Sequence, residues 1–304
     1  MERPSSQSSR SRLFEVVHQN LEIRQYGRAH ELIERALAEE PDAASLHALR
    51  ALVFLRQSRP ADAEAAAREA LLLDPEETAA TRVLARSTML QGRNRESEAH
   101  FLELLRRDPT DVDALCGYAW LQNSVGELEK AELLVREALR IAPTDADAQN
   151  LLSIVQLARG SSKQATLSNQ VGLRLSPDDE VSHLAAAAAA FERFQPFRAR
   201  RHVREALRID PENTDTQEAF HDIDKHCRWP FLLYYGFGKL CGKIPGGALS
   251  VWAAVVAFVF LSDSLGVPRA VVVGISLGYL GLCVYTWLAS PLMKVWVRLF
   301  PARL

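Results

Sequence analysis

The chain has 304 residues, of which 48% are hydrophobic and 24% charged, with a formal net charge of −2. This balance argues against a nucleic-acid partner, because Lys and Arg contacts to phosphate dominate that kind of binding. The four cysteines share no metal-ligand spacing, so we expect no metal site, no cofactor and no disulfide framework.

The N-terminal residues 1–9 are predicted to form a short disordered tail. They are rich in serine and contain no apolar core, so they do not have the pattern of a secretory signal.

From there on, a proline recurs every 34 residues. A leucine precedes each of these prolines by four residues, and mostly small residues precede them by five and by twelve. A fixed period of this length indicates an array of helical repeats. The prolines are Pro41, Pro75, Pro109, Pro143, Pro177 and Pro211.

Each period is predicted to contain two antiparallel helices. Proline ends the second helix, because it cannot donate a backbone hydrogen bond and clashes with the preceding turn. Gly92, Gly126 and Gly160 fall between the two helices, where a residue with positive φ can end the first. The two small positions lie on one helix face and allow neighbouring helices to approach closely.

With these features the chain resembles the tetratricopeptide repeat family over residues 10–213, which hold six repeats. The resemblance implies an all-α fold, a superhelical array of helix-turn-helix repeats whose first helices line a concave face that binds proteins. Residues 214–226 are predicted to form a polar-faced capping helix. The family's aromatic near the start of the first helix is replaced at all six positions, by Leu13, His47, Thr81, Leu115, Gln149 and His183.

The composition changes near Cys227. Residues 225–304 hold eight basic residues and one acidic residue, whereas the preceding residues hold 28 basic and 37 acidic. Such asymmetry points to membrane interaction. We therefore predict a C-terminal membrane helical hairpin. Its parts are an interfacial segment at 227–247, transmembrane helices at 248–265 and 268–289, and a basic tail at 290–304.

Residues 270–289 contain no charge and are long enough to cross a bilayer, whereas a buried soluble helix would carry a polar stripe. The shorter first run leaves open a re-entrant or interfacial helix. Basic residues flank both ends of the hairpin, which predicts that the repeats and both termini are cytoplasmic. The alanine-rich composition suggests a bacterial inner membrane, with a tail-anchored organelle protein as the alternative.

Small residues on the two predicted spans are expected to pack the helices together. The hydrophobic effect does little to associate helices within lipid, so close contact between small residues has to hold them. The same residues leave open a homodimer through the membrane helices. They are Gly274, Gly278, Gly281, Ala253 and Ala257.

A peptide-binding groove is predicted on the first helices of the middle repeats. Arg82 and Arg86 would meet carboxylates of an acidic segment or a C-terminus, and Trp120 would form an apolar platform. The alternative is that both arginines are merely solvated and Trp120 packs between repeats. The groove residues are Arg82, Arg86, Met89, Trp120, Asn123 and Asn150.

No phosphate-binding loop or Ser/His/Asp set can be argued from the scattered histidines, so we predict no catalytic residues and no enzyme. The predicted function is a membrane-anchored scaffold with a protein or peptide partner and the lipid bilayer as its surroundings. The alternative is a subunit of a membrane complex in which the hairpin is the functional part and the repeats are a docking handle.

Overall fold

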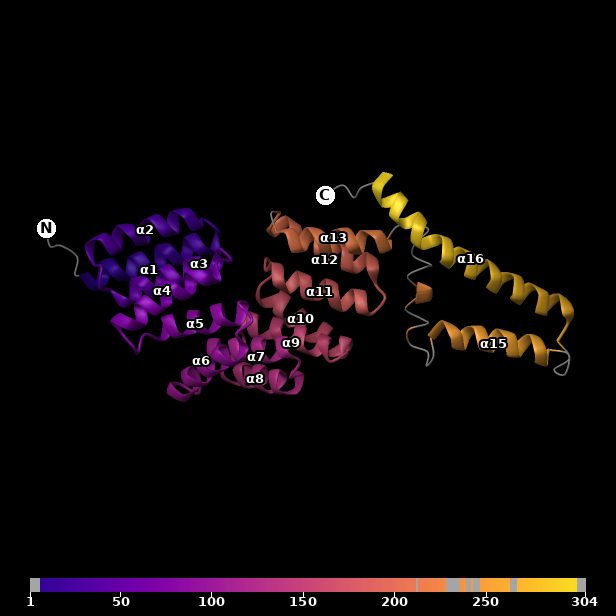
Figure 1. Cartoon of the computed structure of the whole chain (residues 1–304), viewed down its shortest axis with the longest axis horizontal. Helices are drawn as coiled ribbons and strands as arrows, with labels where there is room; N and C mark the ends of the chain where they lie inside the picture. Colours follow the sequence, from indigo (N-terminus) through magenta and orange to yellow (C-terminus); the bar gives the residue numbers. More distant parts are fainter. Residues whose placement is uncertain are drawn as a thin grey trace. The chain divides into compact units, whose positions relative to one another are not determined.

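The computed structural model describes residues 6–211, 213–227, 236–238, 242, 247–262 and 267–299. Every regular element in these ranges is a helix, which confirms the predicted all-α class (Figure 1). The chain divides into two compact units, Met1–Arg159 and Gly160–Leu304.

In the first unit, helices of similar length follow one another with short turns between them. The odd-numbered helices from α3 to α9 contact one another in order, and α3, α5 and α7 each also contact the even-numbered helix that follows. We call the surface formed by α3, α5, α7 and α9 the odd-helix face. The helices are α1 (Ser6–Glu22), α2 (Tyr26–Glu39), α3 (Ala44–Arg56), α4 (Pro60–Leu73), α5 (Thr78–Leu90), α6 (Asn94–Arg107), α7 (Val112–Val125), α8 (Leu128–Ile141) and α9 (Ala146–Ala158).

The predicted small positions form the core of every repeat. At the position twelve before each proline the side chain is completely buried, as the close approach of neighbouring helices requires. The leucine four before the proline, expected as the buried contact, is buried only at Leu37 and half-buried in the other repeats. The completely buried positions are Ala29, Ala63, Ser97, Ala131, Ala165 and Ala199.

A residue with left-handed backbone ends the first helix of each repeat, and these residues are also 34 apart. Gly92, Gly126 and Gly160 confirm the predicted turn glycines, with φ of 75°, 88° and 76°. The other repeats place larger residues in this conformation, which L side chains rarely adopt. These residues are Arg24, Ser58 and Phe194.

The second unit continues the helix pairs and ends them with the predicted cap. Phe220 and Ile223 of the cap helix α13 pack in one apolar cluster with Leu184, Ala187 and Phe191 of α11. The helices of this unit are α10 (Ser162–Leu175), α11 (Glu180–Glu192), α12 (Pro196–Ile209), α13 (Thr214–Cys227), α15 (Gly247–Leu261) and α16 (Arg269–Leu299).

The cap is also held by an ion pair. Arg200 Nη2 of α12 lies 2.8 Å from Asp224 Oδ1 of α13, and the Asp224 side chain is only 4% exposed. The Arg200 guanidinium also lies 6.0 Å from the centre of the Phe220 ring. A buried carboxylate needs such a partner, so this contact fixes the position of α13 on α12.

The predicted membrane hairpin requires correction. Both C-terminal runs are helical, but no helix in the described ranges is long and apolar enough to cross a membrane. The 15 residues of α15 extend about 22 Å, less than a ~30 Å hydrocarbon core. This finding contradicts the predicted integral-membrane location.

Two predicted boundaries also differ. Helix α1 begins at Ser6, inside the predicted tail at 1–9, and α16 continues to Leu299, through most of the predicted basic tail. Apolar side chains of α15 and α16 are exposed, among them Trp252, Phe260 and Leu277. The parts of the predicted segments that fall at residues 1–5, 212, 228–235, 239–241, 243–246, 263–266 and 300–304 lie outside the described residues.

Candidate functional site

Arg82 of α5 is fixed by carboxylates of the next repeat. Its Nη2 donates to Asp111 Oδ2 at 2.8 Å, and its Nη1 lies 3.0 Å from Asp113 Oδ2. Asp111 is the N-cap of α7 and also accepts a hydrogen bond from Ala114 N at 3.0 Å. Arg82 therefore joins two repeats and is less available to a partner than predicted.

Arg86, one turn further along α5, is in a different state. Its side chain is exposed, and among the described residues it makes no hydrogen bond or ion pair. Surrounding protein and the positive charge of Arg56 nevertheless lower the pKa of its guanidinium, although Asp113 and Asp147 oppose that shift. Arg86 therefore reaches solvent although protein atoms surround part of its side chain.

Cys116 lies on the α7 part of the same face. Burial and the negative charges of Asp145 and Asp113 raise the pKa of its thiol to about 12. The thiol is therefore protonated at neutral pH and is no nucleophile. These charges, with Asp147 on α9, make the odd-helix face a surface of mixed charge.

Trp120 and Asn123 follow Cys116 on α7, one and two turns further along. Trp120 is 39% exposed, which leaves part of its ring open to a ligand. Asn123 is half-buried, and its Oδ1 is buried without a hydrogen-bond partner among the described residues. An unsatisfied buried acceptor is costly, but this oxygen is enclosed by the protein and is not open to a bound peptide.

Two other predicted groove residues are less accessible, because Met89 is half-buried and Asn150 is buried. Met89 packs against the apolar cluster that contains Phe101 and Tyr118. Asn150 is only 2% exposed, so its side chain offers almost no surface to a partner. The structure thus brings Arg82, Arg86, Trp120 and Asn123 to an accessible face.

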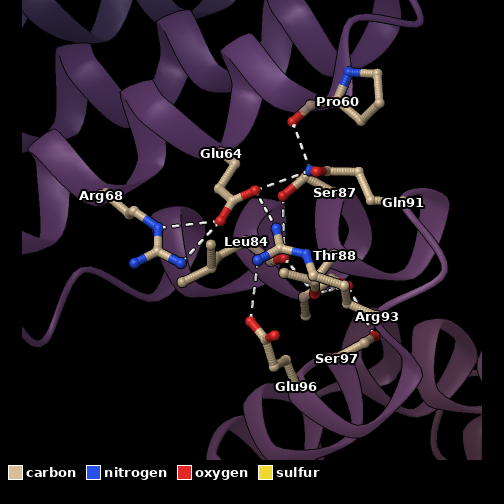
Figure 2. Close-up of polar contacts among 11 residues, drawn as sticks. Pro60, Glu64, Arg68, Leu84, Ser87, Thr88, Gln91, Arg93, Glu96 and Ser97 are labelled. Atoms are coloured by element: carbon tan, nitrogen blue, oxygen red, sulfur yellow. Dashed lines mark hydrogen bonds and ion pairs between the residues drawn. The ribbon is translucent and has the colours of Figure 1, made fainter.

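A carboxylate on each even-numbered helix from α4 to α8 holds the next repeat in place. Glu64 of α4 accepts hydrogen bonds from Gln91 Nε2 at 2.8 Å and from Arg93, both in the α5–α6 turn, and from Arg68 Nη2 at 2.8 Å (Figure 2). Burial alone would raise the pKa of Glu64, but these hydrogen bonds from Gln91, Arg68 and Arg93 lower it. Glu64 is therefore ionised and braces α4 against α5 and α6.

The same position is used in the next two repeats. Glu98 accepts a hydrogen bond from Tyr118 Oη at 2.5 Å and lies 3.2 Å from Lys130 Nζ. Glu132 accepts hydrogen bonds from Arg136 at 2.6 Å and from Arg159. We did not predict these braces, although acidic residues 34 apart, each directly after the buried small residue, were a visible signal.

The small residues expected to pack the C-terminal helices do not do so at the glycines. A Cβ added at Gly274, Gly278 or Gly281 would meet no heavy atom within 4 Å in the described part of the chain. Ala253 and Ala257 lie on α15, which contacts α16. Within the described residues there is also no group of three His, Cys, Asp or Glu side chains that could hold a metal ion.

Comparison with known proteins identifies the repeats. Residues 21–80 and 88–155 match family models described as tetratricopeptide repeat. These matches confirm the resemblance in both segments. No curated protein matches the chain.

Solved structures show the same fold at low sequence identity. A tetratricopeptide repeat protein from Parabacteroides merdae is 14% identical, with a TM-score of 0.60 over 73% of this chain and 86% of that chain. A tetratricopeptide repeat protein from Thermus thermophilus is 19% identical, with a TM-score of 0.55 over 60% of this chain and 98% of that chain. The Cut9–Hcn1 structure of the APC/C is 16% identical, with a TM-score of 0.59, and the match covers 69% of this chain but only 42% of that chain.

Proposed function

We propose that this chain, in which residues 21–80 and 88–155 are tetratricopeptide repeats, is a non-catalytic protein-interaction scaffold. The odd-helix face of the first unit binds an extended segment of a protein partner that carries an acidic group. The repeat fold supports the scaffold role, since proteins of this kind bind protein partners on such faces.

The state of Arg86 is the observation that carries the proposal. A guanidinium that is partly desolvated, close to Arg56 and Arg82, and without an ion pair among the described residues favours an external anion. Arg82 fixes the wall of the site through Asp111 and Asp113, so we assign it a positioning role.

The neighbouring groups define the rest of the ligand. Exposed Trp120 suits an apolar side chain of the ligand. Asp113 and Asp147 repel additional carboxylates, so the preferred segment carries one acidic group and not a long acidic run.

Fluorescent ten-residue peptides test the proposal on the full chain. Each peptide contains one Glu or Asp and is paired with a variant that has Gln or Asn in its place. Each is also made with a free and with an amidated C-terminus, so that the effect of a side-chain carboxylate can be told from that of the terminal carboxylate. Arg86→Ala should lower the affinity for the tightest-binding peptide about tenfold, which is the effect expected from the loss of one charge-assisted hydrogen bond. Arg95→Ala is the matched control, because Arg95 is exposed on α6 and makes no ion pair among the described residues.

Two results would contradict the proposal. One is that no peptide with a carboxylate binds more tightly than the same peptide in which Gln or Asn replaces the acidic residue or the C-terminus is amidated. The other is unchanged affinity of Arg86→Ala while Trp120→Ala, with its helicity intact, also binds normally.

A further inference from the structure

Phe194 occupies a strained position in the turn between α11 and α12. Its φ is 63°, in the left-handed region where the equivalent residues of three preceding repeats are Gly92, Gly126 and Gly160. Glycine would adopt this conformation without steric cost, whereas a bulky aromatic residue there is an outlier. Strain of this kind persists where the side chain contributes a contact that offsets it.

The ring of Phe194 stands on an open part of the surface. Phe194 is 43% exposed, and Phe197, at the start of α12, is 59% exposed. Together with Pro196, Arg198 and Arg201 they line a shallow hollow. Neither arginine side chain makes an ion pair within the described residues.

A segment far along the chain meets this ring. A Cβ built on Gly236 would lie only 2.9 Å from Phe194 Cζ, so a side chain there would collide with the tip of the ring. Gly238, two residues later, would have no heavy atom within 4 Å of its Cβ. Phe237 between them is half-buried. A side chain at Gly236 would therefore have to displace the exposed ring tip, whereas Gly238 has room for one.

We infer that the Phe194 turn is an intramolecular docking site for the segment 236–238, which latches the C-terminal part of the second unit to its last helix pair. Two complementary features carry the inference: an aromatic ring in a conformation suited to glycine, and a glycine at the one point that the ring tip occupies. The contact is small and leaves the ring partly exposed, so the latch is reversible and does not belong to the core.

Photocrosslinking of the full chain tests which segment lies on the ring. Replacing Gly238, where a side chain has room, by p-benzoylphenylalanine places a photoreactive ketone beside the contact without filling it. Irradiation should join residue 238 to a peptide that contains Phe194 of the same chain, as shown by mass spectrometry. The same probe combined with Phe194→Gly is the control and should lose this crosslink. A crosslink between two chains, a crosslink only to another segment of the same chain, or no crosslink at all would overturn the inference.

A second measurement uses the two glycines as a matched pair. Gly236→Leu should release the segment and increase tryptic cleavage after Lys239 and Lys243 several-fold, whereas Gly238→Leu should cleave at the wild-type rate. Both variants should keep the helicity of the repeats, since the segment follows the cap helix. Equal cleavage of the two variants would show that the close approach at Gly236 has no role in docking.

Discussion

The two units use one repeat geometry for two opposite kinds of surface. In the first unit, the odd-helix face presents Arg86, Asp113 and Trp120 to solvent. In the second unit, the corresponding helix α11 carries a run of alanines, and Leu184, Ala187 and Phe191 pack with the cap helix α13.

This difference shows what the 34-residue period does and does not determine. The period places the first helix of each repeat in the stack, because the buried small residues recur with it. The side chains between those positions then decide whether the face is covered by the chain itself or stays open. A charged, half-desolvated face is suited to a partner, and an alanine-rich face is suited to a cap.

Removing an apolar side chain of the cap helix α13 should have the largest effect on stability. Phe220 is 1% exposed in the α11–α13 cluster, so Phe220→Ala should lower the free energy of unfolding of the second unit by about 3–5 kcal/mol. Urea unfolding with hydrogen exchange on α11–α13 measures this loss. Leu167→Ala on α10 is the control, because Leu167 is 64% exposed and its removal should have little effect. Equal stability of both variants would mean that α13 does not cover α11.

Weakening the frame of the open face should have an intermediate effect. Glu64→Gln removes the charge that holds Arg68, Gln91 and Arg93, and should destabilise the first unit by about 1–2 kcal/mol. The folded pKa of Glu64 lies below its ordinary value of 4.5. Its contribution is therefore complete above that value and is lost as the pH falls through the lower, folded pKa.

The pH dependence distinguishes this brace from an ordinary surface acid. Between neutral pH and acid, the stability gap between wild type and Glu64→Gln should narrow, as followed by thermal unfolding at a series of pH values. Glu31→Gln on α2 is the control, since Glu31 is exposed and makes no ion pair in the described ranges. A gap that stays constant down to acid pH would contradict the assignment.

The smallest effect on stability is expected at the proposed binding residue itself. Arg82→Ala should cost about 1 kcal/mol, because Asp111 and Asp113 lose their partner. Arg86→Ala should change the free energy of unfolding by less than about 0.5 kcal/mol, since no ion pair is lost. Chemical denaturation of both variants measures the difference. A larger loss for Arg86→Ala than for Arg82→Ala would place Arg86 in the frame and not in the site.

Much of the repeat region could be predicted from the sequence. Buried small residues, turn glycines and prolines are local requirements of a packed helix pair, so their period shows in the sequence and they lie where expected. The cap helix was predicted at 214–226 and is observed at Thr214–Cys227. Arg82 and Arg86, by contrast, are equivalent in the sequence. Only the position of Asp111 at the start of α7 separates the held arginine from the open one.

The C-terminal part shows where an apolar run misleads. Residues 248–265 were predicted to cross a bilayer from their composition, but α15 ends at Leu261 after 15 residues. Helix length is set by where the backbone turns, which composition alone does not specify. The contact between Gly236 and Phe194 could not be predicted either, because no pattern in the sequence links these two residues, which are more than one repeat apart.

The charge of one side chain distinguishes the last helix pair of the array. The position that holds Glu64, Glu98 and Glu132 holds Arg200 in the last helix pair, and Arg200 pairs with Asp224 of α13. Three of the five preceding repeats carry an anion at this position and the other two hold His30 and Thr166, whereas the last repeat carries a cation. Placed directly behind the pair that contains Glu132, α13 would bring Asp224 against another carboxylate. The charge of Asp224 therefore matches the cap to the helix pair that contains Arg200. An array with fewer repeats should still bind α13 if its last helix pair keeps Arg200.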